Sequence, residues 1–200
     1  MTLAAPSSLV DQQHIVLDYM SWEFYERLLE EVGDRPIRIT YHNGSIEIMA
    51  PLEAHEYGKK RISQLIEGMC QERDIDIVPG GSITFKSREK EAGLEPDECY
   101  YVGREDIPPP DLAIEIDITS RSISRQPIYA ALGVRELWRY DGKRLAVLHL
   151  DPEGRYVEQN SSRLFPFLPM DGFNAFLKRF ETEKNNAVIK AFRKWVGSLP

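Results

Sequence analysis

The sequence predicts one α/β (or α+β) domain, and three observations lead to this prediction. The chain has 200 residues, close to the length of one typical domain. Segments with the 3.6-residue period of a helix are interspersed with short segments of strand character. The sequence contains neither an internal repeat nor a linker long enough to divide it, and its 42% hydrophobic and 28% charged residues are typical of a globular protein.

An arm is expected to precede the first helix. Residues 1–18 show no periodicity, so we expect them to be frayed or to become ordered only on docking. Ser21 can cap a helix over residues 22–31, and Gly33 ends it.

A hairpin and a long helix follow. Asn43-Gly44 is a strong signal for a two-residue turn, and it separates strands expected at residues 37–41 and 46–49. A helix over residues 54–73 is predicted because apolar residues recur in it with helical spacing. These residues are Ile62, Leu65, Ile66 and Met69.

The rest of the chain alternates between expected strands and helices. Strands are expected at residues 75–78, 82–86, 97–102, 112–118, 136–140 and 144–150, with a short one around Tyr156. A short helix is expected at residues 127–132, and two amphipathic helices within residues 170–197 are expected to form a C-terminal extension.

Charge, apolar runs and cysteines narrow the class of protein. A net charge of −7 argues against a protein that coats nucleic acid without specificity. No apolar run approaches the ~20 residues of a membrane-spanning helix, and the start of the chain lacks the features of a signal peptide. Cys70 and Cys99 lack the spacing of a zinc knuckle and are too few for a disulfide framework. We therefore expect a cytoplasmic protein without a membrane partner.

The most informative segment is residues 111–118, in which acidic and apolar residues alternate. Successive side chains of a strand point to opposite faces, so Glu115 and Asp117 are expected on the same face. A half-exposed strand with a solvated polar face would show the same alternation.

Asp97 supplies a second acidic group, in a strand that Pro96 opens. If this strand lies beside that of Glu115, the two carboxylates converge, and they repel each other unless a cation or a proton separates them. Their oxygen atoms suit Mg²⁺ or Mn²⁺. Arg121 and Arg125 follow and can hold a phosphate, although surface cations would explain them equally well.

Three motifs resemble those of a large bacterial family described as restriction endonucleases, within the PD-(D/E)XK nuclease-like superfamily. They are Glu95-Pro96-Asp97, the pair Glu115 and Asp117 at the end of an apolar strand, and residues 129–138 with the sequence YAALGVRELW. The resemblance covers roughly residues 20–150. It implies a restriction-endonuclease-like mixed β-sheet core flanked by helices, and Mg²⁺-dependent hydrolysis of phosphodiester bonds.

The same resemblance implies roles for individual residues. Asp97 and Glu115 match the two acidic positions of the motif, which implies a metal ion held by both carboxylates and the backbone carbonyl of Ile116. The superfamily lysine would stand at position 117, where Asp117 is instead expected to bind metal or activate water. In many family members the next helix supplies the lysine, and here Arg125 aligns with it. An arginine can orient water or stabilise negative charge, but it cannot act as a base.

Glu56 is a further candidate for the site. It lies near the start of the helix expected over residues 54–73, where superfamily nucleases often carry an additional acidic residue. Its carboxylate can reach a metal ion through water from there, although an acidic residue at a helix N-terminus also gains from the helix dipole alone.

Together these observations favour a Mg²⁺- or Mn²⁺-dependent DNA endonuclease. A homodimer is expected, because two cuts on a duplex favour two related sites. A catalytically inactive relative that binds nucleic acid or a protein is the first alternative, because the lysine is missing from its superfamily position. A metal-dependent hydrolase of a smaller phosphoester is the second alternative, because the chain is acidic overall.

Overall fold

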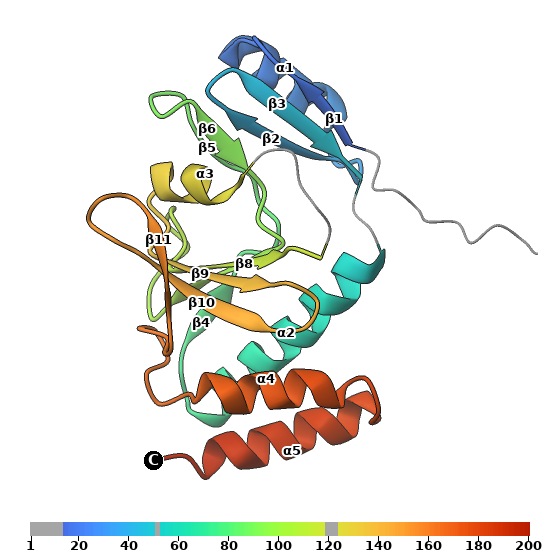
Figure 1. Ribbon diagram of the computed structural model, residues 1–200, viewed down its shortest axis with the longest axis vertical. Helices are drawn as coiled ribbons and strands as arrows, with labels where there is room; N and C mark the ends of the chain where they lie inside the picture. The colour runs from blue at the N-terminus through green and yellow to red at the C-terminus, as the bar shows by residue number, and fades with distance from the viewer. Residues whose placement is uncertain (1–13, 51–52, 119–123) are drawn as a thin grey trace, which may run out of the picture.

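Two β-sheets with helices packed against them form the structure (Figure 1). The computed structural model describes residues 14–50, 53–118 and 124–200. The strands are β1 (His14–Leu17), β2 (Arg38–His42), β3 (Ser45–Met49), β4 (Ile77–Pro79), β5 (Phe85–Ser87), β6 (Ala92–Leu94), β7 (Glu98–Val102), β8 (Leu112–Ile116), β9 (Glu136–Tyr140), β10 (Leu145–Leu150) and β11 (Tyr156–Gln159). The helices are α1 (Trp22–Val32), α2 (Glu53–Glu72), α3 (Gln126–Ala131), α4 (Met170–Arg179) and α5 (Asn185–Gly197).

The first sheet, called sheet A here, has the strand order β1-β3-β2-β6-β5 and only antiparallel pairings. Its β2–β3 hairpin confirms the turn expected at Asn43-Gly44. His42 pairs with Ser45, and the two turn residues have positive φ angles of 47° and 84°. Such angles suit a two-residue turn whose twist matches that of the strands.

Helix α1 packs on sheet A through aromatic side chains. Its N-terminus is capped as expected, because the Ser21 side chain accepts a hydrogen bond from the Phe24 N–H. Trp22 and Tyr25 of the helix meet Tyr41 of β2, with ring centroids 5.1–5.3 Å apart. This cluster attaches the helix to the hairpin that follows it in the chain.

The expectation of an arm over residues 1–18 is wrong for its last part. Residues 14–17 form β1, which pairs with β3 in the register His14↔Met49. The pairing uses backbone groups at the sheet edge and leaves Ile15 58% exposed, so no pattern of buried side chains marks the strand in the sequence. Residues 1–13 lie outside the described part of the chain.

The second sheet, sheet B, has the strand order β11-β10-β9-β8-β7-β4. β8 and β9 are parallel, and the other pairings are antiparallel, which confirms the mixed sheet. α3 lies on the connection between the two parallel strands. β7 lies directly beside β8, as the convergence of Asp97 and Glu115 requires.

The short strands near residue 90 differ most from expectation. β6, with only three residues and Gly93 at its centre, was not predicted. A Cβ on Gly93 would lie 2.3 Å from the Tyr25 hydroxyl, so the close approach of α1 accounts for the glycine. β4 and β5 overlap the strands expected at 75–78 and 82–86 by only two residues each, and they belong to different sheets.

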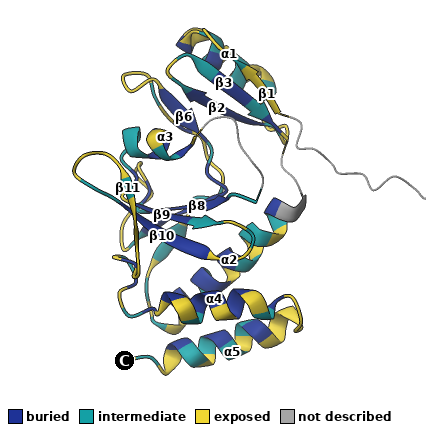
Figure 2. Ribbon diagram, viewed as in Figure 1, coloured by how far each residue is buried: buried dark blue, intermediate teal, exposed yellow. Residues whose placement is uncertain are grey.

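The largest buried cluster lies between sheet B and three helices. The four apolar residues predicted for the buried face of α2 are all fully buried, and α2 packs between β8 and α5. α4 and α5 contribute to the same cluster, and Figure 2 shows their buried faces turned inward. Among the described helices, none is long and apolar enough to cross a membrane.

Candidate active site

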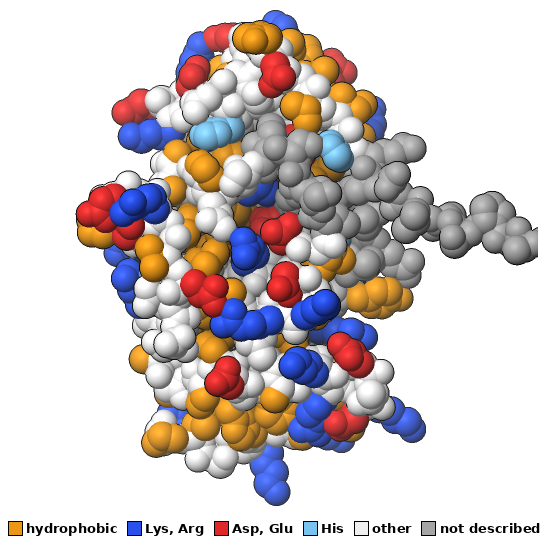
Figure 3. All heavy atoms as spheres, in the orientation of Figure 1, with side chains coloured by type: hydrophobic (Ala, Val, Ile, Leu, Met, Phe, Trp, Pro, Cys, Tyr) orange, Lys and Arg blue, Asp and Glu red, His pale blue; other side chains and the backbone are white. Residues whose placement is uncertain are grey.

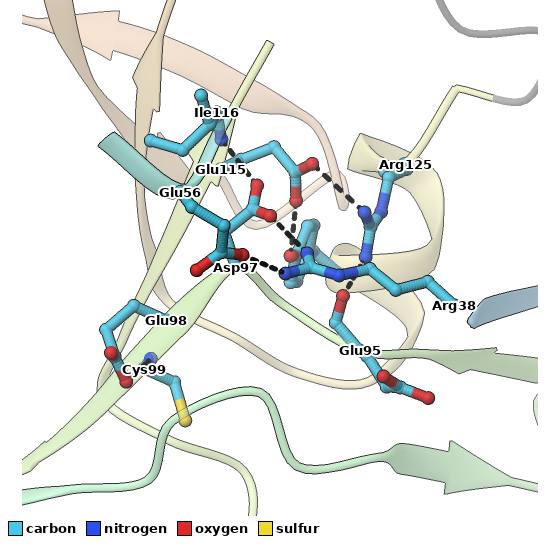
Figure 4. A network of polar contacts seen from close by, with 10 residues as sticks. Arg38, Glu56, Glu95, Asp97, Glu98, Cys99, Glu115, Ile116 and Arg125 are labelled. Carbon is cyan, nitrogen blue, oxygen red and sulfur yellow. Dashed lines mark hydrogen bonds and ion pairs between the residues drawn. The ribbon is translucent and has the colours of Figure 1, made fainter. Parts of the chain in front are cut away.

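Asp97 and Glu115 lie at the centre of a buried polar cluster between the two sheets. The register Glu98↔Ile114, continued by one residue, places Asp97 directly opposite Glu115. Side chains opposite each other on antiparallel strands share a face, with Cβ atoms about 5 Å apart. The two residues are only 1% and 4% exposed, and Figure 4 shows their carboxylates on the same side of the strands.

The Asp97 carboxylate is held from two directions. The Ile116 N–H donates to Oδ2 at 2.7 Å, and the Arg38 guanidinium donates to Oδ1. Arg38 comes from β2 of sheet A, and it is 7% exposed. Its second terminal nitrogen lies 3.6 Å from a carboxylate oxygen of Glu56, whose side chain on α2 is 41% exposed. Arg38 therefore connects residues of sheet A, sheet B and α2.

The Glu115 carboxylate is held by Arg125, the N-cap residue of α3, and by Tyr129 within that helix. Arg125 donates to Oε1 at 3.1 Å, and the Tyr129 hydroxyl donates to Oε2 at 2.6 Å. Residues four apart on a helix lie on the same face, which explains why both side chains meet one carboxylate. The other terminal nitrogen of Arg125 donates to the backbone carbonyl of Glu95.

The electrostatic environment keeps Arg125 charged and Tyr129 neutral. Burial alone would lower the pKa of Arg125, but the charge of Glu115 and further acidic groups outweigh burial and raise that pKa. Burial and the same carboxylate raise the pKa of Tyr129 well above its usual value. The negative charge of Asp97 also raises the pKa of Arg125 and of Tyr129. The cluster thus holds a permanent cation and a neutral hydroxyl donor.

The donor set suits a divalent cation in kind and number. Mg²⁺ is commonly bound by one or two carboxylates, with waters and phosphate oxygens completing its shell. Asp97 and Glu115 can supply those two carboxylates, although each already pairs with an arginine. Within the described ranges, no group of three or more His, Cys, Asp and Glu side chains forms a ready metal cage.

The remaining residues predicted for the site are Ile116, Asp117 and Arg121. Ile116 is present through its N–H, which holds Asp97. Asp117 follows β8 and is half-buried, and its N–H donates to the Tyr140 carbonyl at 2.7 Å. Arg121 lies outside the described residues.

Two contributors were missed from the sequence. Tyr129 stands in the motif that carried the resemblance and four residues after Arg125, so helical spacing would have found it. Arg38 gave no comparable signal. It is 59 residues from Asp97 in the chain, and alternation along β2 does not reveal which neighbouring sheet its side chain meets.

A family model described as "Uma2: Putative restriction endonuclease" matches residues 22–176. The chain belongs to the Uma2 family. The match confirms the resemblance, and it runs from the start of α1 into α4, so it includes Arg38, Asp97, Glu115 and Arg125. The two sheets with flanking helices agree with a restriction-endonuclease-like fold. Uma2 membership suggests a nuclease that binds DNA and uses a divalent metal. The search of curated proteins found no match.

Proposed function

We propose that this Uma2 protein is a Mg²⁺- or Mn²⁺-dependent DNA endonuclease. The observation that supports the proposal is the meeting of Asp97 and Glu115 from neighbouring strands, buried and beside two arginines. A polar group is costly to bury, so a cluster of four charged side chains at this position is more readily explained by chemistry than by stability.

Asp97 and Glu115, with the backbone carbonyl of Ile116, are the groups that would hold the metal. A bound divalent ion would polarise the phosphate and lower the pKa of an attacking water. The protein's own contribution is to hold both carboxylates in place through the Ile116 N–H, the Tyr129 hydroxyl and Arg125.

Arg125 takes the position that aligns with the family's lysine. Because its guanidinium stays protonated, its role is electrostatic: it orients Glu115 and stabilises negative charge that develops on the phosphate. We assign removal of a proton from the attacking water to Asp117, the carboxylate two residues after Glu115. Glu56 is proposed to act on the metal through water, and its ion pair with Arg38, 3.6 Å long, places it at the border of the cluster.

The partner expected for this site is duplex DNA. Figure 3 shows one face of the molecule, on which Lys and Arg side chains gather over the lower half, among acidic ones. Basic side chains of this kind bind phosphate groups along a nucleic acid backbone. A homodimer would bring two such sites to the two strands, and a cytoplasmic location would give access to DNA.

Cleavage of supercoiled plasmid tests the proposal. Purified protein is expected to nick plasmid with Mg²⁺ or Mn²⁺ but not with EDTA. Asp97→Asn and Glu115→Gln are each expected to lower the rate on the order of 10²-fold, because each removes a charge aimed at the reacting centre. Glu158→Gln is the matched control, since it neutralises an exposed carboxylate on β11. Nicking that persists at full rate in both site variants would contradict the proposal.

A non-catalytic DNA-binding protein is the second candidate, and one observation favours it. Asp97 and Glu115 each pair with an arginine, so this four-residue core of the cluster is balanced in charge without a metal ion. Retardation of duplex DNA in a gel, without cleavage in any divalent metal, would support this candidate. Cleavage confined to a small phosphodiester would instead support a hydrolase of smaller phosphoesters.

A further inference from the structure

Arg38 occupies a position that the proposed metal chemistry does not explain. Its guanidinium leaves sheet A, enters the cluster on sheet B and contacts carboxylates of Asp97 and Glu56, as the dashed lines in Figure 4 show. The side chain is 9% exposed, so its charge is largely shielded from water. A shielded cation beside a carboxylate acts strongly on any second cation that binds there.

A divalent ion and Arg38 compete for the same carboxylate. Magnesium–oxygen bonds are about 2.1 Å long, so an ion bound to Asp97 would lie within a few ångströms of the guanidinium. Oδ2 of Asp97 is already engaged by the Ile116 N–H, and Oδ1 is the atom that Arg38 contacts. Two cations at this separation repel each other, and the cation that is bound less firmly is expected to leave.

The two arginines of the cluster differ in how firmly they are held. Arg125 donates to the Glu115 carboxylate and also to the fixed backbone carbonyl of Glu95. Arg38 contacts two side-chain carboxylates, and Glu56 is half exposed on α2. A side chain held by other side chains is released more easily than one held by the backbone. Arg38 is therefore the arginine suited to move.

We propose that Arg38 is the resting counter-ion of Asp97 and that a divalent ion binds by displacing it. The released guanidinium stays tethered to β2 beside the site, where its planar fork can bind two oxygens of a substrate phosphate. Arg38 is thus a phosphate-binding residue whose availability depends on the metal. This inference rests on the proposed function of Asp97 and Glu115 as metal ligands.

Calorimetric titration with Mn²⁺, in the absence of DNA, tests the exchange. Arg38→Gln removes the charge but keeps an amide that can donate to Asp97, and it is expected to bind Mn²⁺ about tenfold more tightly or better. Arg38→Lys keeps the charge and is expected to match the wild type. Arg88→Gln is the matched control, because it removes a charge that pairs with Glu23 outside the site. Equal or weaker binding by Arg38→Gln would overturn the exchange.

A second measurement uses the wild-type protein and does not depend on folding of a variant. In a ¹⁵N NMR titration with Mg²⁺, the Arg38 guanidinium signals are expected to shift and to exchange faster with water, while those of Arg125 keep their protection. Saturation with Mg²⁺ that leaves the Arg38 signals unchanged would contradict the displacement.

Two further variants separate failure of this inference from failure of the proposed function. Asp97→Asn and Glu115→Gln are expected to abolish Mn²⁺ binding in both the wild-type and the Arg38→Gln backgrounds. Binding that survives both changes would refute the metal site itself. If Asp97→Asn and Glu115→Gln abolish Mn²⁺ binding but Arg38→Gln binds Mn²⁺ no more tightly than the wild type, only the role of Arg38 is refuted.

Discussion

Arg125 and Glu115 form an ion pair in which each side chain is only 5% exposed. Such a pair contributes little net stability, because both charges lose their hydration. Removal of one partner is costly, since the other charge is then buried without compensation. The pair thus makes the site sensitive to single substitutions on either side.

Arg125→Met is expected to lower the free energy of unfolding by about 3–5 kcal/mol, because it leaves Glu115 buried beside an apolar side chain. Arg125→Lys keeps the charge and is expected to cost less. Urea denaturation at pH 7 measures both changes. Arg144→Met, which breaks an exposed pair with Glu158, is the control and is expected to cost less than about 1 kcal/mol. Equal losses for Arg125→Met and Arg144→Met would show that burial of the pair is unimportant.

At the scale of elements, β9 and β10 carry a second buried polar pair. His149 lies directly opposite Glu136, and its Nε2 is 3.3 Å from a carboxylate oxygen. Glu136 also accepts hydrogen bonds from Trp138, from Ser162 and from the Arg163 N–H. The bonds from Ser162 and Arg163 attach the loop after β11 to sheet B.

This pair predicts a dependence of stability on pH. Burial lowers the pKa of His149 below its ordinary value of 6.5, although Glu136 opposes this effect. The folded protein then binds fewer protons than the unfolded chain, so His149 contributes stability above pH 6.5 that is lost as the pH falls through its lowered pKa. The free energy of unfolding should fall more steeply from pH 7 to pH 5 in the wild type than in His149→Gln. Identical slopes in the wild type and in His149→Gln would refute the prediction.

At the scale of the whole molecule, the C-terminal helices share the core of sheet B. Phe192 of α5 is fully buried and meets Phe173 and Phe176 of α4 edge to face, with centroids 5.7 and 5.2 Å apart. The same cluster contains residues of α2 and β8. Because β8 carries Glu115, the packing of α5 supports the strand on which the site is built.

Phe192→Ala is therefore expected to destabilise the whole protein by about 3–5 kcal/mol, through lost burial and a cavity. Ile107→Ala, at a position 61% exposed, is expected to change stability by less than about 0.5 kcal/mol. Chemical denaturation followed by both tryptophan fluorescence and circular dichroism measures the effect. Melting of α5 alone, with the signal of sheet B retained, would show that the helices are a separate unit.

Local sequence patterns predicted the elements whose structure depends on residues close to them in the chain. The hairpin at Asn43-Gly44 and the buried face of α2 follow from turn chemistry and helical period, which act over a few residues. β1 and β6 escaped prediction because both are short. β1 leaves most of its side chains exposed, and β6 is centred on a glycine. Their pairing is decided by the strands that they meet.

The sequence by itself determined the family, and its motifs singled out Asp97 and Glu115 as candidate site residues. That their two strands lie side by side was decided by the tertiary structure. Only the tertiary structure decided which cations accompany them. Arg125 could equally have been a surface residue, and Arg38 lies 59 residues from Asp97 in a different sheet. The reason is physical: periodicity specifies the face of an element to which a side chain points, whereas the packing of one sheet against another specifies what that face meets.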